Sequence, residues 1–474
     1  MDLKHYKDFD RPARLIFTGG PRAERLNLIL EHSYRGVMKK NFVSEGEHAG
    51  FLSSSVDGRP WTDTMWTRDA GTMLREITAC GEIGSACLLA ERLMALCLPN
   101  EKGYYVFPEY FRLGEPNSGT ETDGTASILI AFAKLYEILR SPLFCERDFA
   151  DRLAEFSTGR HAPLTFFAEE IESRCFLLGS GEFGGGLNVE GDYFNIVQNM
   201  LAGYAMTCWA EALERTGERS QTGKKLRETA EALERNVRQY FVRDGKWIWC
   251  LDPRTLRPEE RVARENANVG FAGINGVWCM ASDAEGFDLS AWPWQEVCRN
   301  TFFDLLNFPL RREQLEKWGI YTQFNTFCHG LLSSAYGIGY ALQCAVLMRD
   351  RGLLDSMLTF FVDQTISPHP RYQLTREDPY WTYERMLSPD YFELPPEQQD
   401  VGEGCGALNV VNVAEYLKLA RLMTGVEPSG KDAPPFLPAD FTGFSLENVI
   451  LLSPDCGRYD VTFDGKDLKK QKKS

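Results

Sequence analysis

The stretch Leu201-Ala202-Gly203-Tyr204-Ala205-Met206 contains no charged residue and is rich in small side chains. It lies in the middle of a helix that we predict from Tyr193 to Thr216. A helix that is apolar on most faces is normally buried on most faces. The next predicted helix, Thr222 to Val242, carries charge along one side, which is typical of a helix with one solvated face. An inner helix is therefore followed by an outer helix.

The same contrast recurs along the sequence. Further helices that we predict to be buried begin at Gly124, Gly270, His329 and Cys405. The predicted helix from Leu353 to Thr365 again carries charge on one face. Inner and outer helices that alternate in this way predict an all-α fold, an (α/α) six-hairpin toroid, over residues 1–426. Residues 427–474 are predicted to form a Pro-rich strap and a short β-hairpin tail packed on the toroid.

The composition excludes several classes of partner. The formal net charge of −15 disfavours binding to nucleic acid or to an anionic membrane, and no apolar run approaches the length of a membrane span. The 13 cysteines show no metal-binding spacing and the six histidines are not grouped, so we expect no metal and no cofactor. The first residues lack the apolar run of a secretion signal, which predicts a cytoplasmic protein. The oligomeric state stays open.

Polar and aromatic residues are concentrated in the loops before the predicted inner helices. In a toroid of hairpins these loops open at the same end, so residues that are distant in the sequence meet there. One of them leads into Trp66-Thr67-Arg68-Asp69-Ala70. An indole can stack on the apolar face of a sugar ring, and a guanidinium and a carboxylate can bind its hydroxyls. Alternatively, Asp69 only complements the dipole of the helix that starts here.

Other loops at this end supply residues of the same kinds. The residues that we expect to bind a small saccharide are Trp66, Arg68, Asp69, Glu121, Asp123, Trp318 and Trp381. Their side chains combine flat apolar rings with charged groups that form strong hydrogen bonds to hydroxyls.

Two of the loops are rich in carboxylates. In the stretch from Gly181 to Asp192, glycines allow the backbone to bend closely toward a ligand. The loop lacks the Lys-Ser/Thr ending of a phosphate-binding loop. Glu182, Glu190 and Asp192 are therefore candidate catalytic groups, although Glu190 or Asp192 could instead cap the helix that follows.

The segment from Ser367 to Gly404 is longer than an ordinary connection and too aromatic for a disordered linker. Glu384 lies among aromatic residues that could bind a sugar and also shift the pKa of its carboxyl group. Alternatively, Glu384 forms a surface ion pair with a neighbouring arginine. Glu397, Asp400 and Glu403 are further candidates for the same role.

Carboxyl groups on opposite sides of one opening are what glycoside hydrolysis requires. One carboxyl group protonates the leaving oxygen, and the other acts as an ionised group on the opposite face of the sugar. Their separation is about 6.5 to 9.5 Å in inverting enzymes and about 5 to 5.5 Å in retaining enzymes. The two acidic loops could supply such a pair.

The chain resembles the six-hairpin glycosidases, the superfamily that contains glucoamylases, α,α-trehalases and α-L-rhamnosidases. Trp66 to Ala70 is similar to the Trp-x-Arg-Asp element of glucoamylase-type enzymes. The run from Gly191 to Asn199 is similar to the stretch that follows their general acid. Tyr380-Trp381-Thr382-Tyr383-Glu384-Arg385 resembles the catalytic-base region of rhamnosidase-type members, whereas Glu397-Gln398-Gln399-Asp400 resembles that of glucoamylases.

This resemblance implies roles for particular residues. Arg68 and Asp69 would hold the terminal sugar, and Gln198 would join them from the next inner helix. Glu190 would be the acid and Glu384 the base, with inversion as in glucoamylases and with Glu397 as the rival base. A sugar epimerase, a phosphorylase and a non-hydrolytic saccharide-binding protein remain alternatives on the same toroid.

Overall fold

The computed structural model describes most of the chain. The residues that it describes are 9–56, 62–115, 120–179, 193–248, 250–259, 296–297, 300, 332–366, 378–382, 385–387, 395, 407–429 and 432–473. The fold and the contacts reported below concern these residues.

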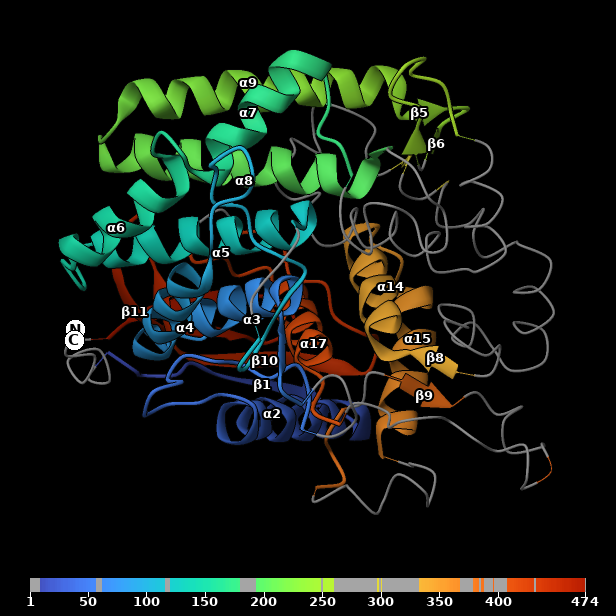
Figure 1. Ribbon diagram of the computed structural model, residues 1–474. Helices are drawn as coiled ribbons and strands as arrows, with labels where there is room; N and C mark the ends of the chain where they lie inside the picture. Colours follow the sequence, from blue (N-terminus) through green and yellow to red (C-terminus); the bar gives the residue numbers. More distant parts are fainter. Residues whose placement is uncertain are drawn as a thin grey trace.

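The described helices fall into an inner and an outer group (Figure 1). The inner helices are α3 (Thr67–Ala79), α5 (Thr122–Arg140), α8 (Ile196–Thr216), α14 (Ala335–Leu347) and α17 (Val410–Thr424). The outer helices are α2 (Pro21–Lys40), α4 (Ile83–Leu96), α6 (Arg147–Thr158), α7 (Pro163–Arg174), α9 (Ser220–Tyr240) and α15 (Arg351–Ile366). Along the ring α8 packs on α5, α5 on α3, α3 on α17 and α17 on α14. The predicted alternation of inner and outer helices is confirmed across this part of the chain.

The composition of the helices explains this arrangement. Helix α3 crosses α5 closely at Gly71, where a β-carbon would lie 2.6 Å from the backbone nitrogen of Ile128. Helix α8 ends at Gly217, whose φ of 69° is a left-handed conformation that favours glycine. The chain then turns back into α9, whose buried residues recur along one side, including Leu226, Leu233 and Val237.

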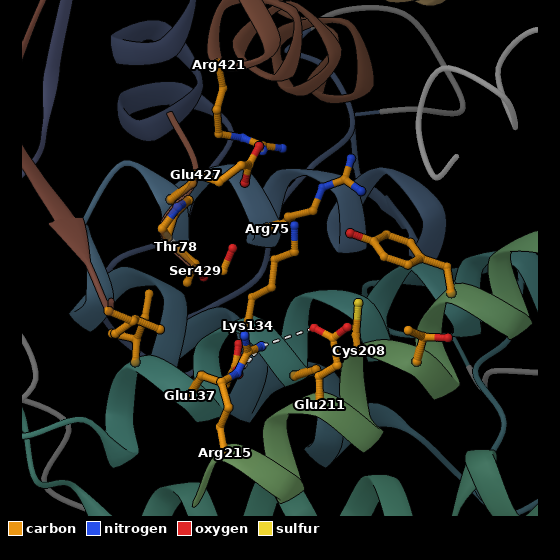
Figure 2. A pocket seen from close by; sticks show the side chains of 17 residues that line it. Arg75, Thr78, Lys134, Glu137, Cys208, Glu211, Arg215, Arg421, Glu427 and Ser429 are labelled. Carbon is orange, nitrogen blue, oxygen red and sulfur yellow. Dashed lines mark hydrogen bonds and ion pairs between the residues drawn. The ribbon is translucent and has the colours of Figure 1, made fainter. Parts of the chain in front are cut away.

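Different features lie at the two ends of the inner helices. At the N-terminal ends of α3 and α5, Arg68 contacts Asp123, so these two helices run in the same direction. At the opposite end, the C-terminal halves of α3, α5, α8 and α17 line a small cavity with charged residues at its walls (Figure 2). The toroid therefore has a mouth and a base, and the predicted saccharide site lies at the mouth.

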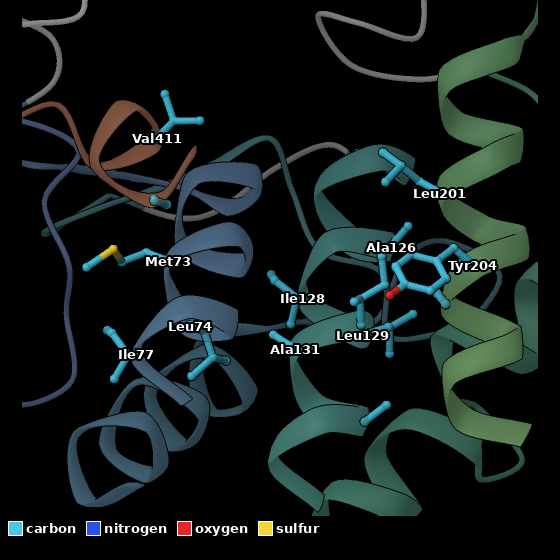
Figure 3. Packing of buried hydrophobic residues seen from close by; sticks show 14 of the residues in the cluster. Met73, Leu74, Ile77, Ala126, Ile128, Leu129, Ala131, Leu201, Tyr204 and Val411 are labelled. Carbon is cyan, nitrogen blue, oxygen red and sulfur yellow. The ribbon is translucent and has the colours of Figure 1, made fainter. Parts of the chain in front are cut away.

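The core fills the space between neighbouring helices. Figure 3 shows Ile128 and Ala131 of α5 facing α3, and Ala126 and Leu129 facing Tyr204 of α8. Buried Trp209 of α8 also donates a 2.9 Å hydrogen bond from Nε1 to the carbonyl oxygen of Leu129. Helices α5 and α8 are thus joined by apolar packing and by a satisfied polar contact.

The C-terminal segment forms the predicted hairpin within a larger sheet. Strands β10 (Phe441–Leu451) and β11 (Gly457–Phe463) pair antiparallel, which confirms the short C-terminal β-hairpin. Strand β12 (Leu468–Lys472) adds to one side, and β1 (Arg14–Gly19) pairs with β10 on the other. The division at residue 426 stays a prediction, while the sheet itself draws a strand from the start of the chain.

Short strands, which the sequence analysis did not predict, precede several inner helices. Strand β2 (Thr64–Trp66) leads into α3 and pairs with β3 (Tyr110–Arg112). Strand β4 (Phe194–Asn195) leads into α8 and pairs with β7 (Cys250–Leu251). Strand β8 (Leu332–Ser334) leads into α14 and pairs with β9 (Arg385–Leu387), and outside this series β5 (Val242–Arg243) pairs with β6 (Lys246–Trp247). Strands of two or three residues are too short to show an alternating pattern.

Candidate functional site

An aromatic pair forms one side of the site. The register of β2 and β3 places Trp66 opposite Tyr110, with ring centroids 5.2 Å apart and an interplanar angle of 54°. Both side chains are half-buried. The indole nitrogen of Trp66 is buried and has no hydrogen-bond partner among the described residues. The pair therefore offers apolar ring surface together with a donor that a ligand could use.

The first turns of α3 and α5 hold two polar contacts side by side. Arg68 Nη1 donates to Oδ2 of Asp123 at 3.2 Å, and the Asp123 side chain is fully buried. Thr67 Oγ1 lies 3.1 Å from Oε2 of Glu121. A β-carbon at Gly124 would lie 2.2 Å from Thr67 Oγ1 and 2.6 Å from Glu121 Oε2, so only glycine permits this approach. Glycine at this position thus allows the starts of α3 and α5 to come close enough for these two contacts to form.

Asp69 is a buried carboxyl group next to this pair. Its exposed fraction is 6%, and burial raises its pKa to about 6, against the opposing effects of Arg68 and of a hydrogen bond from Ser54. Ser54 Oγ also accepts a 3.1 Å hydrogen bond from the backbone N–H of Trp66. Ser54 thus links the aromatic residue to the carboxyl group. A pKa close to neutrality is common in functional sites.

Glu109 brings another carboxyl group to the same place. Its backbone oxygen accepts a 3.0 Å hydrogen bond from the N–H of Thr67, which fixes the residue before β3 against the start of α3. Burial raises the pKa of the Glu109 side chain. The charge of Arg68 lowers this pKa, and the charge of Asp123 raises it. Arg68 is therefore surrounded by several carboxyl groups.

This cluster suits a neutral ligand that is rich in hydroxyls. The carboxyl groups of Asp69, Glu109, Glu121 and Asp123 provide acceptors, and Arg68 provides a fork of donors. Burial raises the pKa of both Asp69 and Asp123, since desolvation disfavours their charged forms. Sugar hydroxyls can donate to such groups and accept from the guanidinium without bringing a net charge into the site.

The structure brings together five of the residues that the sequence predicted for binding. They are Trp66, Arg68, Asp69, Glu121 and Asp123. Gln198 lies in the first turn of α8 and is fully buried. Trp381 is 5% exposed, and its indole nitrogen lies close to Gly36 of α2. The binding roles of all these residues stay predictions.

The remaining predicted site residues lie outside the described part of the chain. They are Glu182, Glu190, Asp192, Trp318, Glu384, Glu397, Asp400 and Glu403. The assignment of an acid and a base among these residues therefore depends on the sequence.

The sequence analysis missed Ser54, Glu109 and Tyr110. The sequence Pro108-Glu109-Tyr110 places an acidic residue next to an aromatic one shortly before a predicted inner helix, which is the pattern used at Trp66. That pattern could have indicated Glu109 and Tyr110. Ser54 carries no comparable signal, since its importance arises from two contacts that depend on tertiary structure.

Two properties of the described residues bear on other classes of function. No group of histidine, cysteine or acidic side chains there has the arrangement of a metal site. None of the helices in that part of the chain has both the length and the apolar character needed to cross a membrane.

Comparison with known proteins identifies the fold. No protein-family model matches the sequence, and the search of curated proteins gives no match. Among solved structures, a glucoamylase from Saccharomycopsis fibuligera is similar with a TM-score of 0.57 and 12% identity, over 86% of this chain and 96% of that one. A wild-type glycosidase has a TM-score of 0.54 and 13% identity, over 84% of this chain and 97% of that one.

A GH78 family rhamnosidase of Bacillus sp. GL1 gives a TM-score of 0.54 and 14% identity. The similarity covers 96% of this chain but 40% of that enzyme. The chain has the fold of these glycosidases, which confirms the predicted (α/α) six-hairpin toroid. At identities this low the likeness establishes the fold and leaves the activity to be tested.

Proposed function

We propose that the protein is a glycoside hydrolase that removes a terminal sugar from a short saccharide or glycoside. The observation that carries this proposal is the cluster at the mouth, where Arg68 and the buried Asp69 in the first turn of α3 directly follow Trp66, which packs on Tyr110. The fold shared with glycosidases supports it. One similar structure is a glycosidase in complex with glucose, so a member of this fold binds a simple sugar.

In this proposal the mouth cluster binds the terminal sugar. The ring packs against Trp66 and Tyr110, the indole N–H donates to a hydroxyl, and Arg68 and Asp69 bind neighbouring hydroxyls. Asp123 accepts a hydrogen bond from Arg68 and Glu121 accepts one from Thr67, so they hold these groups in position as well as adding acceptors. Gln198, Trp318 and Trp381 complete the proposed set.

Catalysis is assigned to two glutamates. Glu190 donates a proton to the leaving oxygen, and Glu384 activates water on the opposite face, which gives inversion. Glu182 and Asp192 are the alternatives for the acid, and Glu397 and Glu403 for the base. This assignment is supported by the sequence resemblance alone.

The test is proton NMR of the purified protein with a panel of α- and β-glycosides. We expect release of a free monosaccharide from at least one substrate, with the first anomer formed opposite in configuration to the substrate. Glu190→Gln and Glu384→Gln should each lower turnover by at least about 100-fold, the scale of general acid–base catalysis, with unchanged circular dichroism.

Other outcomes would redirect the proposal. Line broadening without product would indicate a saccharide-binding protein, and phosphate-dependent product would indicate a phosphorylase. Conversion of a free sugar to its epimer would indicate an epimerase. Near-normal turnover in Glu384→Gln would transfer the role of base to Glu397 or Glu403.

A further inference from the structure

A cavity of about 430 Å³ lies between the C-terminal sheet and the helices next to it. Strands β1 and β10, helices α2 and α17 and the C-terminal end of α3 form its walls (Figure 1). The proposed sugar site is at the N-terminal end of α3, so the two sites lie at opposite ends of this helix. Pockets of about 300 to 1,000 Å³ that combine apolar walls with a few polar groups are typical sites for small molecules.

Most of the cavity wall is apolar. Leu15 of β1 and Leu446 of β10 are paired across the two strands, and Leu417 and Ala420 add the side of α17. The three leucines are only half-buried, so they keep apolar surface that an occupant can cover. Water needs two to four polar partners to be held in a cavity, and this wall offers few. An apolar occupant is therefore favoured over water.

The charged side chains at the cavity do not favour a charged occupant. Arg35 Nη2 lies 2.7 Å from Oε1 of Glu31, and Arg421 Nη2 lies 3.3 Å from Oε1 of Glu76. Arg14, at the start of β1, is exposed to solvent. An ion that enters the cavity would leave water and would meet charges that already have partners or are solvated, which is costly. The occupant should therefore be neutral.

One part of the wall carries two polar groups that suit a neutral partner. They are the phenol of Tyr34 in α2 and the carboxyl group of Glu82, the residue before α4. Burial raises the pKa of Glu82 to about 7, and the charge of Asp10 adds to this effect. Burial, followed by the nearby Cys80 and Glu82, also raises the pKa of Tyr34. A phenol and a protonated carboxyl group can each donate and accept a hydrogen bond, as a ligand hydroxyl does.

We propose that this cavity binds a small neutral molecule that has an apolar body and one hydroxyl group. The apolar body lies against the leucines of β1, β10 and α17, and the hydroxyl exchanges hydrogen bonds with Tyr34 and Glu82. A cavity of about 150 Å³ holds benzene, so a cavity of about 430 Å³ has room for a body of two fused rings. This binding requires no catalysis and does not depend on the proposed hydrolase activity.

Isothermal titration calorimetry at about pH 6 tests the proposal with three probes that share one apolar body. They are 2-naphthol, which is neutral, 2-naphthoate, an anion, and 2-naphthylmethylamine, a cation at this pH. We expect 2-naphthol to bind with a Kd below about 1 mM, and at least about tenfold more tightly than either ion. Equal binding of either ion would refute the requirement for a neutral ligand. No binding of 2-naphthol at about 1 mM would overturn the proposal.

Variants with matched controls locate the binding site. Leu417→Trp, which fills the cavity from α17, should weaken binding of 2-naphthol at least about tenfold. Leu422→Trp, at a half-buried position of α17 outside the cavity wall, should leave it within about twofold. Tyr34→Phe should weaken binding by about threefold or more, the scale of one hydrogen bond, whereas Tyr240→Phe on α9 should leave it within about twofold. Trp66→Ala at the mouth should also leave it within about twofold.

The variants also define the results that would contradict the proposal. Loss of binding in Trp66→Ala would place 2-naphthol at the mouth and overturn it. Unchanged binding in Leu417→Trp would show that the ligand lies elsewhere, and unchanged binding in Tyr34→Phe would refute the role of the hydroxyl. Leu446→Trp, which fills the cavity from β10, replaces Leu417→Trp if that variant does not fold.

Discussion

Replacing Arg68 by methionine tests whether the ion pair between α3 and α5 stabilises the mouth. Methionine keeps an apolar stem and removes the charge and the donors. Asp123 then keeps a buried carboxyl group without its arginine, and its side chain has no exposed surface. The backbone N–H groups of Asp123 and Gly124 still interact with that carboxyl group, which limits the loss.

The contact distance sets the magnitude of the effect. At 3.2 Å between Nη1 and Oδ2, unit charges interact by about 5 kcal/mol at an effective dielectric constant of about 20. Removing one partner of a buried pair costs about 3 to 5 kcal/mol in measured cases. Because the two backbone donors remain, we expect a loss of about 3 kcal/mol in the free energy of unfolding of Arg68→Met at pH 8.

The loss should depend on pH. Burial raises the pKa of Asp123 and Arg68 lowers it, so this pKa rises further in the variant. A carboxyl group with a raised folded pKa lowers stability as the pH increases from its unfolded toward its folded pKa. The protonated form needs no counter-charge. The cost of Arg68→Met should therefore be smaller at pH 5 than at pH 8.

Urea unfolding followed by tryptophan fluorescence measures these differences. A cycle with Asp123→Asn and the double variant isolates the pair, and we expect the double variant to recover more than half of the loss. Arg152→Met is the matched control, because Arg152 pairs with Glu91 at the surface and should cost less than about 1 kcal/mol. A loss below about 1 kcal/mol for Arg68→Met at pH 8, or an equal loss at both pH values, would refute the reasoning. Arg68→Lys serves if the methionine variant does not fold.

Further predictions concern a titrating group, a helix contact and the thiols. Because the pKa of Asp69 is raised to about 6, its contribution to the free energy of unfolding should fall by at most about 3 kcal/mol between about pH 4 and pH 6. The melting temperature of Asp69→Asn should not show the decrease between these pH values that the unchanged protein shows. An identical dependence of melting temperature on pH in both proteins would contradict this prediction. Gly71→Ala should cost about 1 to 3 kcal/mol in thermal unfolding, because its β-carbon would overlap backbone atoms of α5, whereas Gly223→Ala in α9 should be neutral or stabilising. Among the described cysteines, iodoacetamide should modify exposed Cys145 and Cys175 first in the folded protein, and peptide mapping that finds the buried thiols equally modified would contradict the burial.

The sequence predicted the helices well because the patterns of apolar and charged residues that mark them extend over many residues. The alternation between the apolar run of α8 and the charged face of α9 extends over many residues, and it fixes which helix is buried. The helix expected to start within the stretch from Trp66 to Ala70 is observed to begin at Thr67. Helix ends are the least certain part of any pattern, because capping depends on local contacts.

The site was predicted in part, for reasons that differ between residues. Trp66, Arg68 and Asp69 are adjacent in sequence and could be found as a motif. Glu109 and Ser54 join them only through the pairing of β2 with β3 and through hydrogen bonds across the fold. The raised pKa of Asp69 depends on burial, and burial follows from packing between helices that no local pattern contains.

The pairing of strand β1 with a strand far along the chain affects folding during synthesis. Arg14 of β1 pairs with Glu447 of β10, so β1 leaves the ribosome long before its hydrogen-bonding partner exists. Until then the strand exposes an unpaired edge next to α2, and such edges favour association with other chains. Contacts this distant in sequence also slow folding, because the loop must close before the pairing compensates for the lost entropy. The sheet should therefore assemble only after β10 has been synthesised, and newly made chains should depend most on chaperones until then.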